Sequence, residues 1–413
     1  MTLRINPDRL WQNLMAMVEI GPLSKGGCNR QTLSDLDEAG RDLFRSWCRA
    51  LDLKLTSDAA GNLFARYEGH DPSLAPLVLG SHLDTQPTGG KFDGILGVLA
   101  GLETVQVLAE AGIRPERPVE IAVWMNEEGS RFAPAMMGSG VYADMLDLEA
   151  VRATKDAEGI TVGAELDRHG YAAGPDPRAK DIHAYLELHI EQGPVLEAEG
   201  KEIGVVTGAQ GIRWYDLTVT GSEAHAGPTP MAMRKDPMNA VPELVEGILT
   251  IGRRDADARA TIGCFNALPA SRNVIPGTLK ITVDLRHPSE AELTDMDAVL
   301  GALLEDLRAK HPGLGFELVQ IWHSPVMEFD RRLVSAIRSG AESRGYSHRD
   351  IVSGAGHDAL MVALRAPTAM IFTPCRDGIS HNEAEHIEPE QAAAGADVLL
   401  GAVLDFLEIS PRG

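Results

Sequence analysis

The chain has 413 residues, of which 44% are hydrophobic and 24% charged, so we expect a folded globular protein of two domains. The formal net charge of -22 argues against a nucleic-acid partner and requires a local Arg or Lys for any anionic substrate. The N-terminus lacks a signal-peptide pattern, no apolar run is long enough to span a bilayer, and the four cysteines are scattered. These features predict a reduced, cytoplasmic protein with no membrane partner.

Helical and buried-strand patterns alternate in the first part of the chain. Residues 6–18 and 34–51 are predicted helices, 63–67 and 77–81 strands, 95–111 a helix and 119–124 a strand. A strand, a helix and a second strand in this order indicate a parallel crossover. Ligands of open α/β sheets bind beyond the carboxyl ends of such strands, so the residues that follow them are candidate site residues.

The pattern changes after about residue 207. Alternating strands are predicted over 215–220, 279–285 and 316–321, with helices over 238–253 and 290–310. Beyond residue 327 the chain returns to helix and to a buried strand over 369–372. We therefore expect a discontinuous α/β domain formed by 1–208 and 327–413, with a smaller α+β domain inserted at 209–326.

Polar residues with metal-binding side chains follow apolar runs at four places along the chain. They supply five potential ligands, in the order His82, Asp93, Glu128, His189 and His381. Imidazoles and carboxylates together suit zinc, manganese or cobalt, and a carboxylate can bridge two such ions. Any one of these residues alone would more simply be a turn, surface or core residue. Their combination favours a two-metal hydrolase.

Two further acids have expected roles beside these ligands. Asp84 is expected to fix the tautomer of His82 through its carboxylate, although an Asp at this place could instead cap a turn. Glu127 precedes Glu128 and is expected to act as general base toward a metal-activated water. The alternative for this pair is two solvated glutamates in a loop.

Three residues of the inserted segment have side chains suited to substrate binding. Arg286 ends an apolar strand and could hold a carboxylate bidentately, while His225 and Asn273 could stabilise an oxyanion. Each of them alone could equally be a surface or structural residue.

Six stretches combine these residues with distinctive neighbours: Gly80-Ser81-His82-Leu83-Asp84-Thr85, Gly90-Lys91-Phe92-Asp93-Gly94, Asn126-Glu127-Glu128-Gly129, His189-Ile190-Glu191-Gln192-Gly193, Gly354-Ala355-Gly356-His357-Asp358-Ala359 and Gly378-Ile379-Ser380-His381-Asn382. With them, the chain resembles the M20 metallopeptidase clan over nearly its whole length. It is most similar to the hydantoinase/carbamoylase branch, which includes N-carbamoyl-L-amino acid hydrolases, β-ureidopropionases and allantoate amidohydrolases. The resemblance implies a metallopeptidase-like α/β catalytic domain with a mixed sheet, and an inserted α+β dimerisation (lid) domain.

The resemblance also implies a role for each site residue. His82, Asp93 and His189 would hold one divalent ion, and Asp93 would bridge to a second ion held by Glu128 and His381. Glu127 would be the base, and His225 would reach across a homodimer into the neighbouring site. The residues implied to contact substrate are Gln192, Asn273, Arg286 and Gly356. The donor set accepts zinc, manganese, cobalt or nickel.

The expected reaction is hydrolysis of the N-carbamoyl (ureido) C–N bond of an N-carbamoyl-L-amino acid or β-ureidopropionate. It would give the amino acid, carbon dioxide and ammonia. Allantoate amidohydrolase is the nearest alternative, and an M20-type aminoacylase or dipeptidase is the next. A metal-free binding protein of this fold would be expected to lack some of the five ligands, and all five are present.

Overall fold

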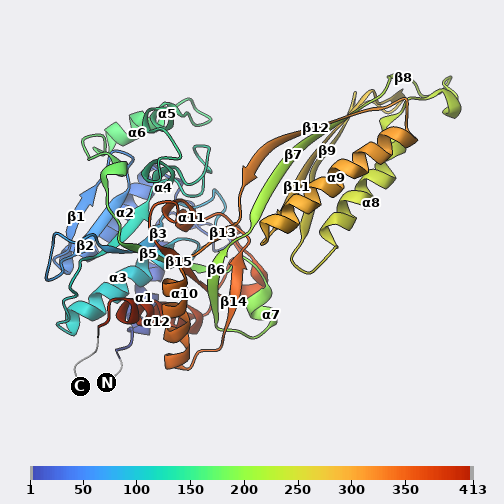
Figure 1. Ribbon diagram of the computed structural model, residues 1–413. Coiled ribbons are helices and arrows are strands. Elements are labelled where there is room, and N and C mark those ends of the chain that lie inside the picture. The colour runs from blue at the N-terminus through green and yellow to red at the C-terminus, as the bar shows by residue number, and fades with distance from the viewer. Residues whose placement is uncertain (1–2, 410–413) are drawn as a thin grey trace. The chain divides into compact units, whose positions relative to one another are not determined.

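The computed structural model describes residues 3–409, and the chain divides into two compact units (Figure 1). The first unit comprises Met1–Gly208 and Glu328–Gly413, and the second comprises Ala209–Met327. The second unit is therefore an insertion in the first along the sequence, with its end one residue beyond the expected 326. Within residues 3–409, no helix is both long and apolar enough to cross a membrane.

A mixed nine-stranded sheet forms the centre of the first unit. Its order is β1-β2-β4-β3-β5-β15-β6-β13, with β14 paired to β6. The strands are β1 (Lys54–Ser57), β2 (Leu63–Tyr67), β3 (Leu77–His82), β4 (Val119–Trp124), β5 (Ala184–Ile190), β6 (Ile203–Ala209), β13 (Met327–Glu328), β14 (His348–Ser353) and β15 (Thr368–Thr373). Strand β3 runs parallel to β4 and β5, and β15 runs parallel to β5, whereas β2 is antiparallel to β4 and β6 is antiparallel to β15. This arrangement confirms the α/β class and the mixed sheet.

The four central parallel strands are buried along their whole length, as expected for strands covered on both faces. The helices of this unit are α1 (Pro7–Val18), α2 (Asp35–Ala50), α3 (Ile95–Glu110), α4 (Met137–Tyr142), α5 (Leu148–Ala153), α6 (Val162–Arg168), α7 (Val195–Ala198), α10 (Arg331–Arg344), α11 (Asp358–Val362) and α12 (Pro389–Phe406). Helix α3 packs very closely on β5, since a Cβ added at Gly97 would lie 2.4 Å from the Leu188 carbonyl oxygen. This close packing places the start of α3 directly beside the strand ends.

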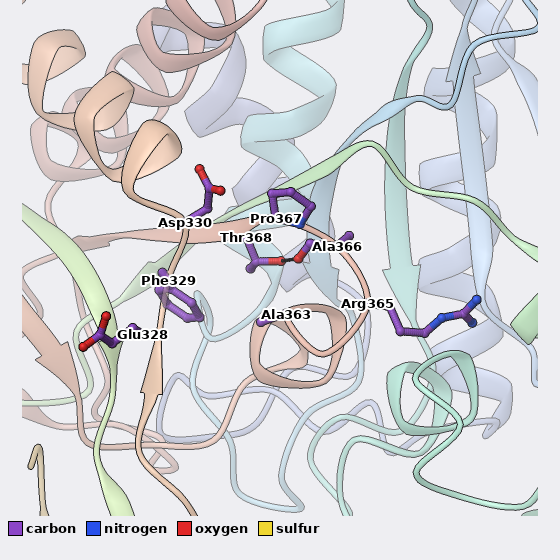
Figure 2. Close-up of a pocket in the computed structure, with 8 residues that line it drawn as sticks. All are labelled: Glu328, Phe329, Asp330, Ala363, Arg365, Ala366, Pro367 and Thr368. Atoms are coloured by element: carbon purple, nitrogen blue, oxygen red, sulfur yellow. Dashed lines mark hydrogen bonds between the residues drawn. The ribbon is translucent and has the colours of Figure 1, made fainter. Parts of the chain in front are cut away.

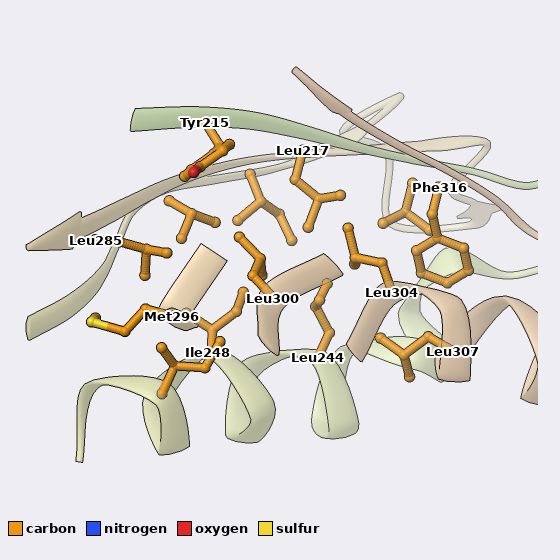
Figure 3. Close-up of a cluster of buried hydrophobic side chains, with 14 of the residues drawn as sticks. Tyr215, Leu217, Leu244, Ile248, Leu285, Met296, Leu300, Leu304, Leu307 and Phe316 are labelled. Atoms are coloured by element: carbon orange, nitrogen blue, oxygen red, sulfur yellow. The ribbon is translucent and has the colours of Figure 1, made fainter. Parts of the chain in front are cut away.

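The second unit is a four-stranded antiparallel sheet with two helices on one face (Figure 3). Its sheet has the order β12 (Gly315–Ser324), β7 (Gly211–Thr220), β11 (Thr278–His287) and β9 (Arg259–Leu268). The helices are α8 (Val241–Gly252) and α9 (Glu290–Lys310), and a short pair is formed by β8 (Ala224–His225) and β10 (Val274–Ile275). Along β7, Tyr215, Leu217 and Val219 face the helices, whereas the alternate side chains lie on the open face.

The core of the second unit can be tested on helix α9. Leu300 is fully buried between sheet and helices, whereas its neighbour Val299 is 43% exposed. Leu300→Ala should lower the free energy of unfolding by about 2–5 kcal/mol, because a buried leucine leaves a cavity. Val299→Ala is the matched control and should change it by less than about 0.5 kcal/mol. Urea titrations followed by circular dichroism measure both, and equal midpoints would contradict this packing.

Candidate metal centre

The carboxyl ends of neighbouring parallel strands bring the first candidate ligands together. His82 is the last residue of β3, His189 lies near the end of β5, and the Glu127–Glu128 pair follows β4. The register of β3 with β5 runs only from Leu77–Ala184 to Leu79–Leu186, so the two strands have separated before they reach the histidines. The histidine rings lie with centroids 6.0 Å apart in the space that this separation leaves.

His82, Asp93 and His189 form the first group of ligand atoms. Asp93 lies two residues before helix α3, and its Oδ1 lies 3.4 Å from His82 Nε2 and 3.1 Å from His189 Nε2. All three side chains are buried. His82 Nε2 has no hydrogen-bond partner among residues 3–409. A buried nitrogen lone pair left in this way fits a metal ion, because buried polar atoms otherwise find partners.

Asp93, Glu128 and His381 form a second group around the other oxygen of the same aspartate. His381 lies in the loop between β15 and α12, and its Nε2 is 3.6 Å from Asp93 Oδ2 and 3.3 Å from Glu128 Oε2. The backbone of His381 is left-handed, with a φ of 53°. Such a conformation is costly for a non-glycine residue and is often retained where function requires it. Asp93 therefore presents one oxygen to each group, as a bridging carboxylate would.

The second ring nitrogens of both buried histidines contact main-chain oxygens. His82 Nδ1 lies 2.9 Å from the Asp84 carbonyl oxygen, and His189 Nδ1 lies 2.9 Å from that of Ile190. A carbonyl oxygen can only accept, so each Nδ1 carries the proton and each Nε2 faces the cluster as an acceptor. His189 Nε2 accepts from the Gly94 N–H at 3.1 Å.

The expected role of the Asp84 carboxylate was wrong. Its Oδ1 is 3.9 Å from His82 Nδ1, so the main-chain oxygen of Asp84 makes the close contact that orients the ring. The carboxylate instead accepts hydrogen bonds from the backbone N–H groups of Glu127 at 3.4 Å and Glu128 at 3.3 Å. Asp84 therefore orients a histidine through its backbone and the two glutamates through its side chain.

The site concentrates buried acids. Burial, reinforced by the charge of Asp93, raises the pKa of Glu128 to about 8, and burial also raises the pKa of Glu127 well above its usual value despite the nearby His82. Glu127 Oε2 lies 3.5 Å from His82 Nε2, beside the first group. Carboxylates held this close repel one another unless cations neutralise them. The charge and the nitrogen and oxygen donors therefore both fit divalent metal ions.

Polar side chains not predicted as ligands hold the two carboxylates. Gln192 Nε2 and Ser380 Oγ donate to Asp93 Oδ2 at 2.8 and 2.7 Å, and Gln86 Nε2 donates to Glu128 Oε2 at 2.7 Å. Glu385 accepts from the backbone N–H groups of Phe92 at 2.8 Å and Asp93 at 3.2 Å. Gln192 was predicted to contact substrate, whereas here its amide contacts the shared aspartate. Gln86, Ser380 and Glu385 were missed, although all three lie close in sequence to a predicted ligand.

Gly356 is exposed and lies next to this cluster. A Cβ added there would be 3.3 Å from Met136 Cε, and the adjacent His357 packs against His189 with ring centroids 4.7 Å apart.

A separate pocket of about 440 Å³ lies at the opposite, amino end of β15 (Figure 2). It is lined by Glu328, Phe329, Asp330, Ala363, Arg365, Ala366, Pro367 and Thr368. The pocket contains none of the candidate ligands.

The three predicted substrate residues of the second unit fall at two ends of its sheet. Arg286 pairs with Ile212 of β7, whereas β8 with His225 follows Thr220, the last residue of β7 (Figure 1). The Asn273 carbonyl oxygen accepts from the Ala226 N–H at 2.9 Å, so Asn273 accompanies His225. Eight residues of strand separate the ends, roughly 26 Å at about 3.3 Å per residue. One small molecule cannot contact both ends of a single chain.

Local hydrogen bonds orient the guanidinium of Arg286 and fix the tautomer of His225. Arg286 donates to the Asp284 carboxylate through Nε at 3.0 Å and Nη2 at 2.8 Å. His225 Nδ1 accepts from the Gly227 N–H at 3.1 Å, which places the ring proton of the neutral imidazole on Nε2. His225, the exposed last residue of β8, therefore presents an N–H donor.

Comparison with known proteins identifies the family. Residues 78–405 match the model of peptidase family M20/M25/M40. An N-carbamoyl-L-amino-acid amidohydrolase of Rhizobium meliloti is 49% identical, with 98% of each chain covered, and an allantoate amidohydrolase of Bacillus subtilis is 34% identical over 84% of this chain and 85% of that protein. The crystal structure of a hydantoinase/carbamoylase family amidase from Burkholderia multivorans has a TM-score of 0.93 and 51% identity, covering 97% of this chain and 98% of that one. The chain therefore belongs to peptidase family M20/M25/M40, in its hydantoinase/carbamoylase branch.

Proposed function

We propose that this enzyme hydrolyses the N-carbamoyl group of an N-carbamoyl-L-amino acid, or of the related β-ureidopropionate, with the aid of two divalent metal ions. The observation that carries the proposal is Asp93, whose two oxygens face two separate sets of ligand atoms with Glu127 beside them. Relatives named N-carbamoyl-L-amino-acid amidohydrolase support the substrate class.

His82 and His189 with Asp93 would hold one ion, and Glu128 and His381 with Asp93 would hold the second. Divalent ions in such a site polarise a carbonyl group and lower the pKa of water. The donors are nitrogen and oxygen only, so zinc, manganese, cobalt and nickel are all acceptable.

Glu127 is the proton carrier in the proposed reaction. Its carboxylate takes a proton from the attacking water, whose oxygen bonds to the ureido carbon. The C–N bond to the amino acid then breaks, and Glu127 returns the proton to the leaving nitrogen. The released carbamate decomposes to carbon dioxide and ammonia.

Arg286 and His225 recognise the two charged ends of the reacting molecule. Arg286 would bind the substrate carboxylate, with Asp284 orienting its guanidinium. The N–H donor of His225 would stabilise the negative charge that develops on the ureido oxygen, and Asn273 would assist from the same loop region. Gly356 would allow substrate to approach the site closely, because it adds no side chain to the wall.

The separation of Arg286 from His225 and Asn273 supports a homodimer. If both ends of the sheet serve catalysis, each must serve a different site, so the inserted unit would deliver His225 and Asn273 to the partner subunit. Apolar side chains on the open face and on edge strand β12 offer a surface for such an association: Trp214, Val319, Ile321 and Trp322 are each at least 41% exposed.

Allantoate is a second candidate substrate, because a relative named allantoate amidohydrolase also matches most of the chain. It likewise presents a ureido carbon and a carboxylate. Ammonia release from N-carbamoyl-L-amino acids, β-ureidopropionate and allantoate distinguishes these possibilities. Highest kcat/KM with allantoate would replace the proposed substrate class.

Removal of metal should destabilise the protein. A ligand that binds only the native state adds about 2.7 kcal/mol when its free concentration is 100 times Kd. Dialysis against a chelator should therefore lower the melting temperature and abolish ammonia release, and manganese, cobalt or zinc should restore both. The His82→Ala/His189→Ala variant should gain less stability from added metal. A melting temperature that is insensitive to chelator and metal would contradict the metal assignment.

Glu127→Gln should reduce turnover by about 10²–10⁴-fold because the amide cannot accept a proton. Metal content should stay at the wild-type value, since Glu127 is not among the proposed ligands. Glu116→Gln, on an exposed acid, is the control and should be fully active. Near-normal ammonia release by Glu127→Gln would remove this residue from the base role.

Hybrid dimers test which residues act together. His225→Ala and Arg286→Ala homodimers should each be about 10²–10³-fold less active, the loss expected for one stabilising donor. Co-expressed with different tags and purified as a hybrid, they should recover up to about half of the wild-type activity, because one site contains neither substitution.

A His225→Ala/Asn273→Ala hybrid is the matched control for this recovery. Both residues lie at the same end of the sheet, so each site of this hybrid contains one substitution and activity should stay low. Recovery in this control, or none in the His225→Ala/Arg286→Ala hybrid, would refute the proposed division between subunits.

A further inference from the structure

We propose that Glu385 is the positioning residue that sets Asp93 between the two ligand groups, and that Gly90 is required because the Glu385 carboxylate occupies the space of a Cβ. The inference rests on the proposed two-metal function and assigns a role to two residues outside the ligand set.

Glu385 anchors the backbone of the Asp93 turn. Its Oε1 accepts hydrogen bonds from two consecutive N–H groups, of Phe92 at 2.8 Å and of Asp93 at 3.2 Å. The side chain is only 1% exposed and comes from a segment almost 300 residues further along the chain. These two bonds restrain the main chain at the residue whose carboxylate faces both groups, so a shift in them would move both Asp93 oxygens.

Gly90 gives independent evidence that this carboxylate has a fixed place. A Cβ added at Gly90 would lie 1.9 Å from Glu385 Cδ and 2.1 Å from each carboxylate oxygen. Gly90 is not among the glycines with a positive φ, so its backbone would accept alanine. The constraint at this position is therefore the space that Glu385 occupies, and not the conformation of the chain.

The same C-terminal segment also contacts the Asp93 side chain. Ser380 Oγ donates to Asp93 Oδ2 at 2.7 Å, and His381 Nε2 lies 3.6 Å from that oxygen. Residues 380–385 thus contribute a hydrogen bond to the shared carboxylate, a ligand of the second group and the anchor of the Asp93 backbone. We infer that this segment couples the geometry of the two ion sites.

Burying the Glu385 carboxylate carries a free-energy cost that a purely structural role does not explain. Its Oε2 is buried with no hydrogen-bond partner among residues 3–409. A buried polar atom without a partner destabilises a protein, so its retention calls for a reason. Because only Oε1 holds the two N–H groups, a glutamine should be able to replace Glu385 in positioning Asp93.

Cobalt binding to the chelator-treated full-length protein tests the inference. Glu385→Ala should weaken cobalt binding by about 10–100-fold, as observed for partners of metal ligands, and should alter the visible absorption of bound cobalt. Glu385→Gln should keep the cobalt affinity and the absorption spectrum of the wild-type protein. Glu390→Ala, which removes an exposed acid shortly after Glu385, is the control and should match wild type.

Gly90→Ala provides a second, independent variant that keeps the carboxylate. It should reproduce the cobalt defect by displacing Glu385, whereas Gly90→Ala/Glu385→Ala should be no worse than Glu385→Ala. Such strong non-additivity is expected for residues in contact and not for distant, independent sites.

Unchanged cobalt affinity and spectrum in Glu385→Ala, with only a lower melting temperature, would overturn the positioning role. Additive effects of Gly90→Ala and Glu385→Ala would overturn the proposed reason for Gly90. A wild-type protein that binds no cobalt would overturn the proposed function as well. Wild-type cobalt binding beside an unaltered Glu385→Ala variant would overturn this inference alone.

Discussion

The contacts of one carboxylate organise the candidate metal centre. Asp93 faces His82 and His189 with one oxygen and His381 with the other, and it is held by hydrogen bonds to its side chain and its backbone. Ligands from β3, β5 and the C-terminal loop converge on a residue just before helix α3. The order of the central strands serves this convergence, because parallel neighbours end at the same edge of the sheet.

The same concentration of acids makes the site unfavourable without cations. Burial is the largest cause that raises the pKa of Glu127 and of Glu128, and the charge of the neighbouring Asp93 raises both further. The surrounding structure holds the Asp93 and Glu128 carboxylates with amide and hydroxyl donors, and that of Asp84 with a main-chain N–H, which orient the carboxylates and leave their charge available. A site of this kind is suited to bind divalent ions, and it links metal binding to the stability of the fold.

The inserted unit places a geometrical constraint on the proposed catalysis. Its ten-residue strands separate Arg286 from His225 and Asn273 by nearly the length of the sheet. Residues so far apart on one rigid sheet cannot close on a single small substrate. The proposed dimer, in which each subunit supplies one end to its own site and the other end to its partner, would resolve this constraint, and the exposed apolar side chains of β12 are in keeping with such an association.

The sequence by itself determined the α/β class, the family and the strand ends at which polar residues gather, because these depend on local periodicity and short motifs. Only the tertiary structure decided which atoms of these residues contact one another. The Asp84 side chain holds the glutamates rather than His82, Gln192 contacts Asp93, and Asn273 accompanies His225. Glu385 and Gly90 lie almost 300 residues apart, and no local pattern indicates that one occupies the space of the other's missing Cβ. Such contacts depend on differences of a few tenths of an ångström in the relative positions of distant segments, which residue spacing along a chain does not specify.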